Sequence, residues 1–290
     1  EEFLNDTLID FWMQWICRHE NPTTSKVHVF TSHFFTTLLE EGVDAVSSWT
    51  RKKSIDIFDK DFIFIPINEA LHWSLCVVVN PGYIENAVRR LARCQNEKDS
   101  TTGNKNTINN DLQDRLPCLL FMDSLKAHRK TKVANKVREW LSLEWKRLGK
   151  NSFPNARGIH IYSKNSSWPF TKDLMKVYDP RVPYQDNCWD CGVFVCRYAC
   201  ALYEQRNNII TYNDIINDDN HTPFEKAITN APWFQFGKFD IVRLRQEMRT
   251  LIDRLCQLYK CVKTTRESED ERGLLAMDIE SNSVTEITDA

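Results

Sequence analysis

The segment CGVFVCRYACALYEQ, residues 191–205, constrains the fold most, because its side chains are apolar on nearly every side. Only Arg197 and Glu204 interrupt it, and these two share one face of a helix. This pattern is typical of a helix that is buried except for a narrow exposed stripe. A hydrophobic fraction of 42%, with nine Trp and sixteen Phe, supplies core to surround it. The sequence therefore predicts a globular protein with a large core.

Short β-branched and aromatic runs elsewhere predict a sheet. We expect buried strands at 61–67, 73–79 and 118–124, with weaker candidates at 158–163 and 174–179. We expect helices at 5–18, 28–41, 132–149 and 239–261. Asn5 or Asp6 would cap the first helix, and Gly149 would end the third. Strands and helices mixed irregularly along the chain favour an α+β fold.

Two polar stretches interrupt this order. Residues 81–117 hold a possible helix and then a run almost devoid of apolar side chains, which indicates a solvated insertion at about 84–117. The insertion is either an extra binding loop or a spacer, and we favour a spacer for its polar half because longer loops cost little closure entropy. From Thr264 the sequence is acidic and aperiodic, which predicts disorder. We therefore expect one domain over 1–263 and a tail over 264–290.

The bulk composition excludes several classes of protein. A net charge of -2 argues against a dedicated nucleic-acid binder, which usually carries a basic excess. No apolar run approaches the ~20 residues of a membrane span, and no signal peptide is visible at the start. The opening residues EEFLNDTLID are typical of a domain interior, so we expect the chain to begin inside a longer protein. Its ten cysteines lie mostly in apolar segments, which favours a reducing compartment.

Four of these cysteines fall in or just after QDNCWDCGVFVC, residues 185–196. Cys188 and Cys191 have the spacing of a zinc knuckle, but the second pair should follow at about 12 or more residues. Cys196 and Cys200 come too soon for that. A thioredoxin-like redox pair would follow the first strand of a βαβ unit, whereas this CxxC comes late in the chain. We therefore expect no metal and no cofactor.

Nucleophilic catalysis is the third interpretation of these cysteines. Asp190 would cap the helix that begins at Cys191, which places this thiol in the first helical turn. Free main-chain N–H groups and the helix dipole favour a thiolate there. Gly192 would leave room for a substrate main chain to approach closely. The other nearby cysteines lack this combination.

A nucleophilic thiolate needs a base, and usually a group that orients the base. His72 stands where a turn enters a predicted strand, and Asp123 ends another predicted strand. A carboxylate at the end of an apolar strand is costly unless it is hydrogen-bonded, and an imidazole would satisfy it. Taken alone, His72 is more simply a surface turn histidine, and Asp123 is more simply a helix cap. Two adjacent strand ends could also bring them together beside Cys191.

Four segments in this order, EFLNDTLIDFW, DIFDKDFIFIPINEALHWSL, LLFMDSL and QDNCWDCGVFVCRY, jointly resemble the Ulp/SENP family of SUMO-specific cysteine proteases. The resemblance covers about residues 1–260, and the long insertion is most like the subgroup that trims poly-SUMO chains. It implies an adenain-like α+β cysteine-protease fold, in which helices flank a mixed central sheet and the nucleophile starts a helix. The family order of His, Asp and Cys makes His72, Asp123 and Cys191 the catalytic residues. Gln185 matches the family's glutamine six residues before the nucleophile, an oxyanion donor.

The same resemblance implies the partners of the chain. SUMO and SUMO-conjugated proteins would be the substrates of a monomeric, nuclear enzyme that uses no nucleic acid and no membrane. Trp73 and Phe3 match aromatic positions that roof a narrow tunnel over the Gly-Gly tail of SUMO, and such a tunnel excludes residues that have a Cβ. Phe3 stands where many family members have tryptophan, a departure shared by the same subgroup. The alternative is that both rings belong to the core.

Two other functions remain as alternatives. One is the same chemistry on another ubiquitin-like modifier, as in the deneddylating branch of the wider family. The other is a SUMO-binding module without activity, although such a module has no use for His72, Asp123, Gln185 and Cys191 together. Cys188 is either an ordinary loop residue without a redox role or a resolving thiol that forms a reversible disulfide with oxidised Cys191.

Overall fold

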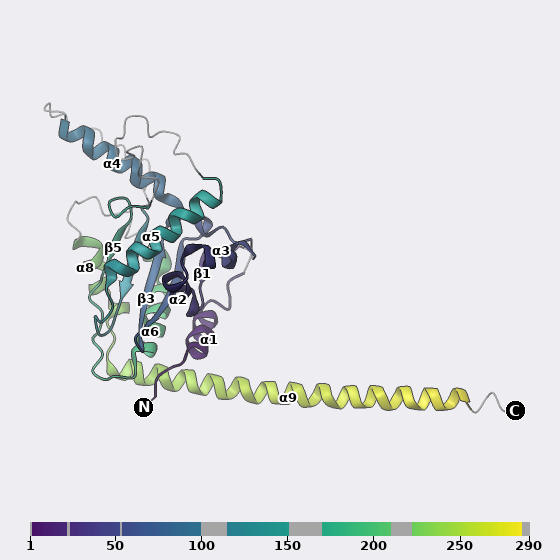
Figure 1. Ribbon diagram of the computed structural model, residues 1–290. Coiled ribbons are helices and arrows are strands. Elements are labelled where there is room, and N and C mark those ends of the chain that lie inside the picture. Colours follow the sequence, from purple (N-terminus) through teal and green to yellow (C-terminus); the bar gives the residue numbers. More distant parts are fainter. Residues whose placement is uncertain are drawn as a thin grey trace. The chain divides into compact units, whose positions relative to one another are not determined.

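The computed structural model describes residues 2–21, 24–52, 54–99, 115–150, 170–209 and 222–285 (Figure 1). The chain divides into two compact units, Glu1–Ile241 and Val242–Ala290. The first unit contains the sheet and every residue predicted to take part in catalysis.

In the described part of the first unit, the strands form a five-stranded mixed sheet. Its strands are β1 (Val27–Val29), β2 (Phe62–Glu69), β3 (His72–Val79), β4 (Cys118–Met122) and β5 (Lys176–Tyr178). They lie in the order β1-β2-β3-β4-β5, so neighbours in sequence are neighbours in the sheet. The three central strands pair antiparallel, and both outer strands pair parallel to their neighbours. Together with the flanking helices this sheet confirms the predicted α+β fold class.

Helices surround the sheet in the first unit and extend into the second. The α-helices are α1 (Asp6–Ile16), α2 (His33–Glu40), α3 (Val43–Arg51), α4 (Ile84–Asp99), α5 (Lys130–Arg147), α6 (Cys191–Glu204), α8 (Thr222–Asn230) and α9 (Lys238–Thr285). The short 3-10 helices are η1 (Ile57–Asp59), η2 (Pro81–Tyr83) and η3 (Pro232–Phe234). At the start of α1 the predicted cap is confirmed, because Asn5 Oδ1 accepts the Leu8 N–H at 3.0 Å.

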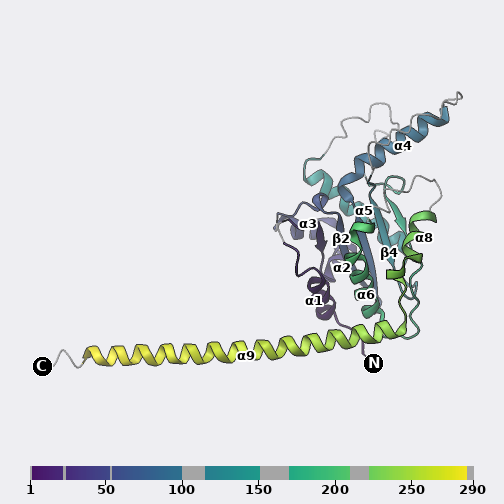
Figure 2. The same ribbon diagram turned by 180° about the vertical axis from the view of Figure 1, so that it is seen from behind.

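Each face of the sheet is covered by a different helix. Alternate residues of the central strands, such as Ile65, Val78 and Phe121, join one core with α2 and α5. The remaining strand residues point to the opposite face, where α6 packs against β3. Views from opposite sides show α5 over one face and α6 over the other (Figures 1 and 2). The predicted burial of the 191–205 helix is confirmed, since all but a few of its residues are buried.

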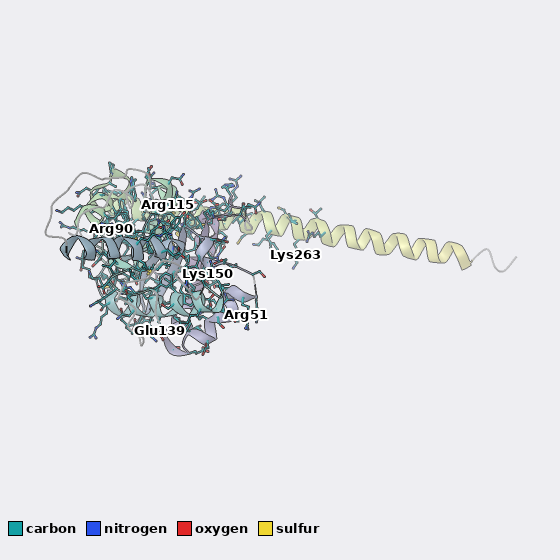
Figure 3. The ribbon with its side chains drawn as sticks, turned by 90° about the horizontal axis from the view of Figure 1, so that it is seen from above. Arg51, Arg90, Arg115, Glu139, Lys150 and Lys263 are labelled. Carbon is teal, nitrogen blue, oxygen red and sulfur yellow. The ribbon has the colours of Figure 1, made fainter. Side chains whose placement is uncertain are left out.

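The C-terminus of α5 confirms the stop predicted at Gly149. Gly149 has φ +69° and donates its N–H to Lys146 O, while Lys150 donates to Trp145 O. This pair of bonds is the Schellman motif, which favours glycine at the left-handed position. Lys150, labelled in Figure 3, then pairs with Asp56 at 2.9 Å and lies 5.2 Å from the Phe58 ring. The end of α5 is thereby tied to η1.

The segment predicted as one helix at 28–41 is instead a strand followed by a helix. Val27–Val29 pairs with β2, and α2 begins only at His33. The reason is that Val and Phe at this point fit either structure, and the free edge of β2 offers main-chain partners that a sequence pattern does not reveal.

The predicted insertion begins with a helix, as expected, because α4 starts at Ile84. Most of the polar half of the insertion, and the weak strand candidate at 158–163, lie outside the described residues. Where the description resumes, Arg115 approaches Asp61 at 3.8 Å and stacks over the Tyr83 ring at 5.5 Å. Arg115 and Arg90 of α4 lie on the same side of the molecule (Figure 3). The insertion therefore leaves and rejoins the first unit beside η2.

The helix predicted at 239–261 is longer in the structure. Helix α9 begins at Lys238 and continues to Thr285. Once a helix is nucleated, each further residue adds a hydrogen bond at small cost, and Glu, Arg, Leu and Ala in this stretch propagate it well. Among the described residues, no helix has the length and apolar character needed to cross a membrane.

Candidate active site

Cys191 is the first residue of α6, and it is almost completely buried. The loop that leads into it is organised by Asn187, whose Oδ1 accepts the N–H groups of Trp189 (3.1 Å) and Asp190 (3.0 Å). Asp190 occupies the predicted N-cap position, but its carboxylate makes no cap bond to the helix. It accepts from Asn187 Nδ2 at 2.8 Å instead. The thiol is therefore at a helix N-terminus, as predicted, on a loop fixed by a different residue.

Gly192 has a different structural role from the one predicted. A Cβ built at Gly192 would lie 3.0 Å from Ile9 Cδ1 and 3.0 Å from Leu4 Cβ. These atoms belong to α1 and the segment before it, so the glycine allows α6 to pack closely on the N-terminal part of the chain. The side-chain position of Gly192 therefore points at Leu4 and Ile9, and not at a space for a substrate main chain as predicted.

His72 and Asp123 meet as the sequence predicted. His72 is the first residue of β3, and Asp123 follows the last residue of β4. Because Leu75 pairs with Met122 across these antiparallel strands, the start of one strand lies beside the end of the other. His72 Nε2 lies 2.6 Å from Asp123 Oδ1. Both side chains are buried.

The carboxylate of Asp123 is held by the loop that follows it. Its Oδ1 also accepts the Leu125 N–H at 2.9 Å, and its Oδ2 accepts the His128 N–H at 2.8 Å. Burial acts to raise the pKa of Asp123, but the bond to His72 and these two main-chain bonds outweigh it. The pKa of Asp123 is therefore lowered, and this carboxylate stays ionised beside the imidazole.

The electrostatic balance at His72 has the opposite sign. Burial acts to lower the pKa of His72, while hydrogen bonds to Asp123 and Cys191, with the negative charge on both, raise it to about 9. Because Nε2 is engaged by Asp123, Nδ1 is the ring nitrogen left to face the thiol. At neutral pH the site thus favours an imidazolium between a carboxylate and a sulfur.

Gln185 lies in the same constellation. It is buried, its Oε1 accepts from Ser124 Oγ at 2.8 Å, and its main-chain N–H donates to Ser124 O at 3.2 Å. Its Nε2 donates to Asn187 O at 2.6 Å and makes a longer contact of 3.3 Å to Asn187 Oδ1. Gln185 therefore connects the Asp123 loop to the Cys191 loop.

The two predicted aromatic residues have different environments. Trp73 is only 3% exposed, and its Nε1 donates to Leu4 O at 3.2 Å. Phe3 is 55% exposed, so its ring is not part of the core. Phe3 directly precedes Leu4, and Trp73 donates to the Leu4 carbonyl. Leu4 is also the residue that a Cβ at Gly192 would meet.

Three further residues complete the site and were missed from the sequence. Ser124 and Asn187 hold Gln185, and His128 contacts both strands of the hairpin that carries His72. The motifs LLFMDSL and QDNC include Ser124 and Asn187, so a closer reading of the polar residues within them could have found both. Nothing in the sequence distinguishes His128 from the other histidines.

His72, Asp123 and His128 also offer ligand atoms within 4.8 Å of one another, a set that could hold a metal ion. Both ring nitrogens of His128 are already hydrogen-bonded, and His72 Nε2 is bonded to Asp123. An ion would have to displace those bonds. The arrangement is thus that of a hydrogen-bonded network.

Comparison with known proteins shows which family this chain resembles. A model of the Ulp1 protease family, C-terminal catalytic domain, matches residues 2–257. Sentrin-specific protease 7 of Homo sapiens is 27% identical over 301 residues, which cover 88% of this chain and 25% of that protein. Probable ubiquitin-like-specific protease 2B of Arabidopsis thaliana is 32% identical over 212 residues, covering 68% of this chain and 19% of that protein.

The chain therefore spans about a quarter of the human relative's length. A solved structure of the SUMO protease Ulp1, with the catalytic cysteine oxidized to a sulfenic acid, aligns with a TM-score of 0.49 and 21% identity. That alignment covers 86% of this chain and 77% of the other. Since the family model extends over almost the whole first unit, including every residue of the site, the chain belongs to the Ulp1 protease family.

Proposed function

We propose that this chain is a SUMO-specific isopeptidase that cleaves the bond between the C-terminal glycine of SUMO and a lysine side chain. The observation that carries the proposal is the buried pair of His72 and Asp123, joined at 2.6 Å, with Cys191 close enough to act on the pKa of His72. Membership of the Ulp1 protease family supports the same chemistry. His72, Asp123 and Cys191 are the proposed catalytic residues.

In the proposed reaction the Cys191 thiolate attacks the glycine carbonyl carbon and forms a tetrahedral intermediate. The C–N bond then breaks, and the His72 imidazolium gives its proton to the leaving lysine amine. Water attacks the resulting thioester, His72 takes a proton from that water, and the thiolate leaves with SUMO released as a carboxylate. Asp123 fixes the ring so that Nε2 carries a proton and Nδ1 faces the sulfur.

The oxyanion would be stabilised by the Gln185 side-chain amide and the Cys191 main-chain N–H. The longer 3.3 Å contact of Gln185 Nε2 is the one that substrate would replace, while the 2.6 Å bond keeps the amide in place. Loss of one such donor typically raises the barrier by about 2.7–4 kcal/mol. The buried anchoring of Gln185 by Ser124 supports this pre-organised role.

For substrate binding we propose that Trp73 and Phe3 flank the Gly-Gly tail. Trp73 directly follows the base, and its bond to Leu4 fixes the N-terminal segment that carries the exposed Phe3 ring. Glycines fit such a position because they have no Cβ.

The finer parts of the proposal concern the whole protein. We infer that poly-SUMO chains are among the substrates, that SUMO and its conjugates are the partners of a monomeric enzyme, and that it acts in the nucleus. We also infer that residues 1–263 form the catalytic part and 264–290 an acidic tail. Relatives named sentrin-specific and ubiquitin-like-specific proteases support the substrate class.

The experiment is a panel of fluorogenic C-terminal reporters made from SUMO paralogues, NEDD8 and ubiquitin. We expect turnover of the SUMO reporters, its loss in Cys191→Ala with SUMO binding retained, and labelling of Cys191 by a SUMO vinyl sulfone. Preferential turnover of the NEDD8 reporter would favour a protease for that modifier. Binding without turnover of any reporter would favour a module without activity.

A further inference from the structure

The hairpin that carries His72 has an unfavourable turn. Ala70 and Leu71 connect β2 to β3, and their φ values are +53° and +62°. Two-residue hairpin turns of this kind favour Asn and Gly, because other L side chains rarely adopt the left-handed region. The Leu71 side chain is 84% exposed, so its burial does not stabilise the turn. Such a conformation persists only where neighbouring contacts hold it.

His128 supplies contacts on both sides of this turn. Its Nε2 lies 3.0 Å from the main-chain oxygen of Glu69, the last residue before the turn. Its Nδ1 lies 2.7 Å from the Oγ of Ser74, a fully buried residue two positions after His72. A carbonyl oxygen only accepts, so Nε2 carries the proton and Nδ1 accepts from the Ser74 hydroxyl. The ring thereby bridges the two strands beside their connection.

The same residue also contacts the catalytic pair. The main-chain N–H of His128 donates to Asp123 Oδ2 at 2.8 Å. Its ring lies against the ring of His72, with centroids 4.8 Å apart and an angle of 61° between the planes. His128 therefore bonds both to the carboxylate of Asp123 and to the strand that presents the His72 imidazole.

We propose that His128 is a positioning residue, which clamps the Ala70–Leu71 turn and so keeps His72 in register with Asp123. The clamp consists of the His128 ring, the Ser74 hydroxyl and the Glu69 carbonyl. It deepens the proposed function, and only its kinetic test rests on that function. Without the clamp the turn relaxes, the His72–Asp123 bond lengthens, and the catalytic geometry is populated less of the time.

The kinetic test compares His128→Ala with His128→Gln, whose amide also offers one donor and one acceptor. We expect His128→Ala to lower kcat on a SUMO reporter by about 10- to 100-fold, with KM within about twofold. We expect His128→Gln to retain more of the activity. Ser74→Ala should lower kcat in the same way, and the Ser74→Ala/His128→Ala double variant should lose no more than His128→Ala alone, since both act through one contact.

A matched control tests whether any loosened tether has this effect. Lys132 of α5 pairs through Nζ with the side chain of the same Glu69, at 2.5 Å, without touching the turn carbonyl. Lys132→Ala should leave kcat unchanged. A loss of kcat in Lys132→Ala equal to that in His128→Ala, or additive losses from Ser74 and His128, would overturn the clamp. If His128→Ala does not fold, Ser74→Ala with the Lys132→Ala control decides.

A second readout does not depend on the reaction. Titration of the His72 imidazole by NMR should give a lower midpoint in His128→Ala than in the parent protein, because the hydrogen bond to Asp123 is weakened. The midpoint in Lys132→Ala should not move. An unchanged His72 midpoint in His128→Ala overturns the proposal even if the enzyme is active. A shifted midpoint in a protein that cleaves no reporter upholds the clamp and overturns only the proposed function.

Discussion

Charge at the site is set by a few contacts of single residues. His72 lies between two groups that carry negative charge, and these contacts outweigh the effect of burial on its pKa. In the proposed mechanism, the protonated ring is then available as the acid when the amine leaves. The pH dependence of cleavage follows from this balance.

We expect kcat/KM to fall on the alkaline side with a midpoint near 9, because His72 loses its proton as the pH rises through about 9. Asp123→Asn removes the charge that raises the pKa of His72, so the His72 titration should move to lower pH by roughly 1–3 units. Activity should also fall by up to about 10⁴-fold. The measurements are a pH–rate profile of the parent protein and NMR titration of both proteins. An alkaline limb near 6.5 in the parent protein would contradict this assignment.

Cys188 is exposed, and its redox role remains a prediction. If Cys188 resolves an oxidised Cys191, peroxide followed by dithiothreitol should restore less activity in Cys188→Ser than in the parent protein. Irreversible oxidation of Cys191 would be read by mass spectrometry. Equal recovery in both proteins removes the idea.

Single residues were predictable where their chemistry is unusual for their position. A cysteine opening a helix stood out by its chemistry. His72 and Asp123, each more simply a turn histidine or a helix cap when taken alone, were selected by the family resemblance, and the structure brings all three together. Ser124 and Asn187 had only their place inside the family motifs as a signal, and His128 had none, because the importance of all three depends on which loop atoms they reach after folding. Contacts of that kind have no signature in spacing or composition.

At the scale of elements, the site depends on close packing of α6 against the N-terminal part of the chain. Gly192 favours this packing, since a Cβ there would lie 3.0 Å from side-chain atoms of Leu4 and Ile9, which would have to shift by a few tenths of an ångström. The same Leu4 accepts the hydrogen bond from Trp73. A substitution at Gly192 that displaces Leu4 would therefore also disturb the hydrogen bond to Trp73.

We expect Gly192→Ala to lower the free energy of unfolding by about 1–3 kcal/mol through overpacking. Ile9→Val alone should cost about 0.5–1.5 kcal/mol, but it removes Cδ1, one of the two atoms that would lie 3.0 Å from the new methyl group. The double variant should therefore be destabilised by less than the sum of the single variants. Urea denaturation of the four proteins measures this coupling, and strict additivity would show that Ile9 does not limit the space.

Elements were predictable in proportion to their length and pattern. The strands β2, β3 and β4 and the helices α1, α5 and α6 have strong periodicity or clear ends, and they form close to the predicted positions. The three-residue strand β1 was missed because its pairing, not its sequence, makes it a strand. The end of α9 was misplaced because an acidic sequence lowers hydrophobic burial without preventing helix propagation.

For the whole molecule, the question is how much of the chain the activity requires. Every residue of the site lies in the first unit, and the family match ends at residue 257. The second unit begins at Val242, within α9. The site thus gives no reason for the last part of α9 to take part in the reaction.

Truncation after Lys263 should therefore leave kcat/KM on a monomeric SUMO reporter within about twofold, since every residue of the site belongs to the first unit. The unfolding midpoint of the first unit should also stay the same. The control is truncation after Phe236, which removes the buried Ile241, Leu244 and Met248 and should destabilise the protein. A large loss of activity on removing 264–290 would assign the tail to the catalytic part.

The sheet and α6 draw the site from widely separated parts of the chain. His72 begins β3, Asp123 follows β4, and Cys191 arrives only with α6, more than a hundred residues after the base. On a ribosome, the histidine and aspartate can pair long before the sulfur has been synthesised. Under the proposed function, a nascent chain that stalls before α6 lacks the nucleophile and cannot cleave a substrate.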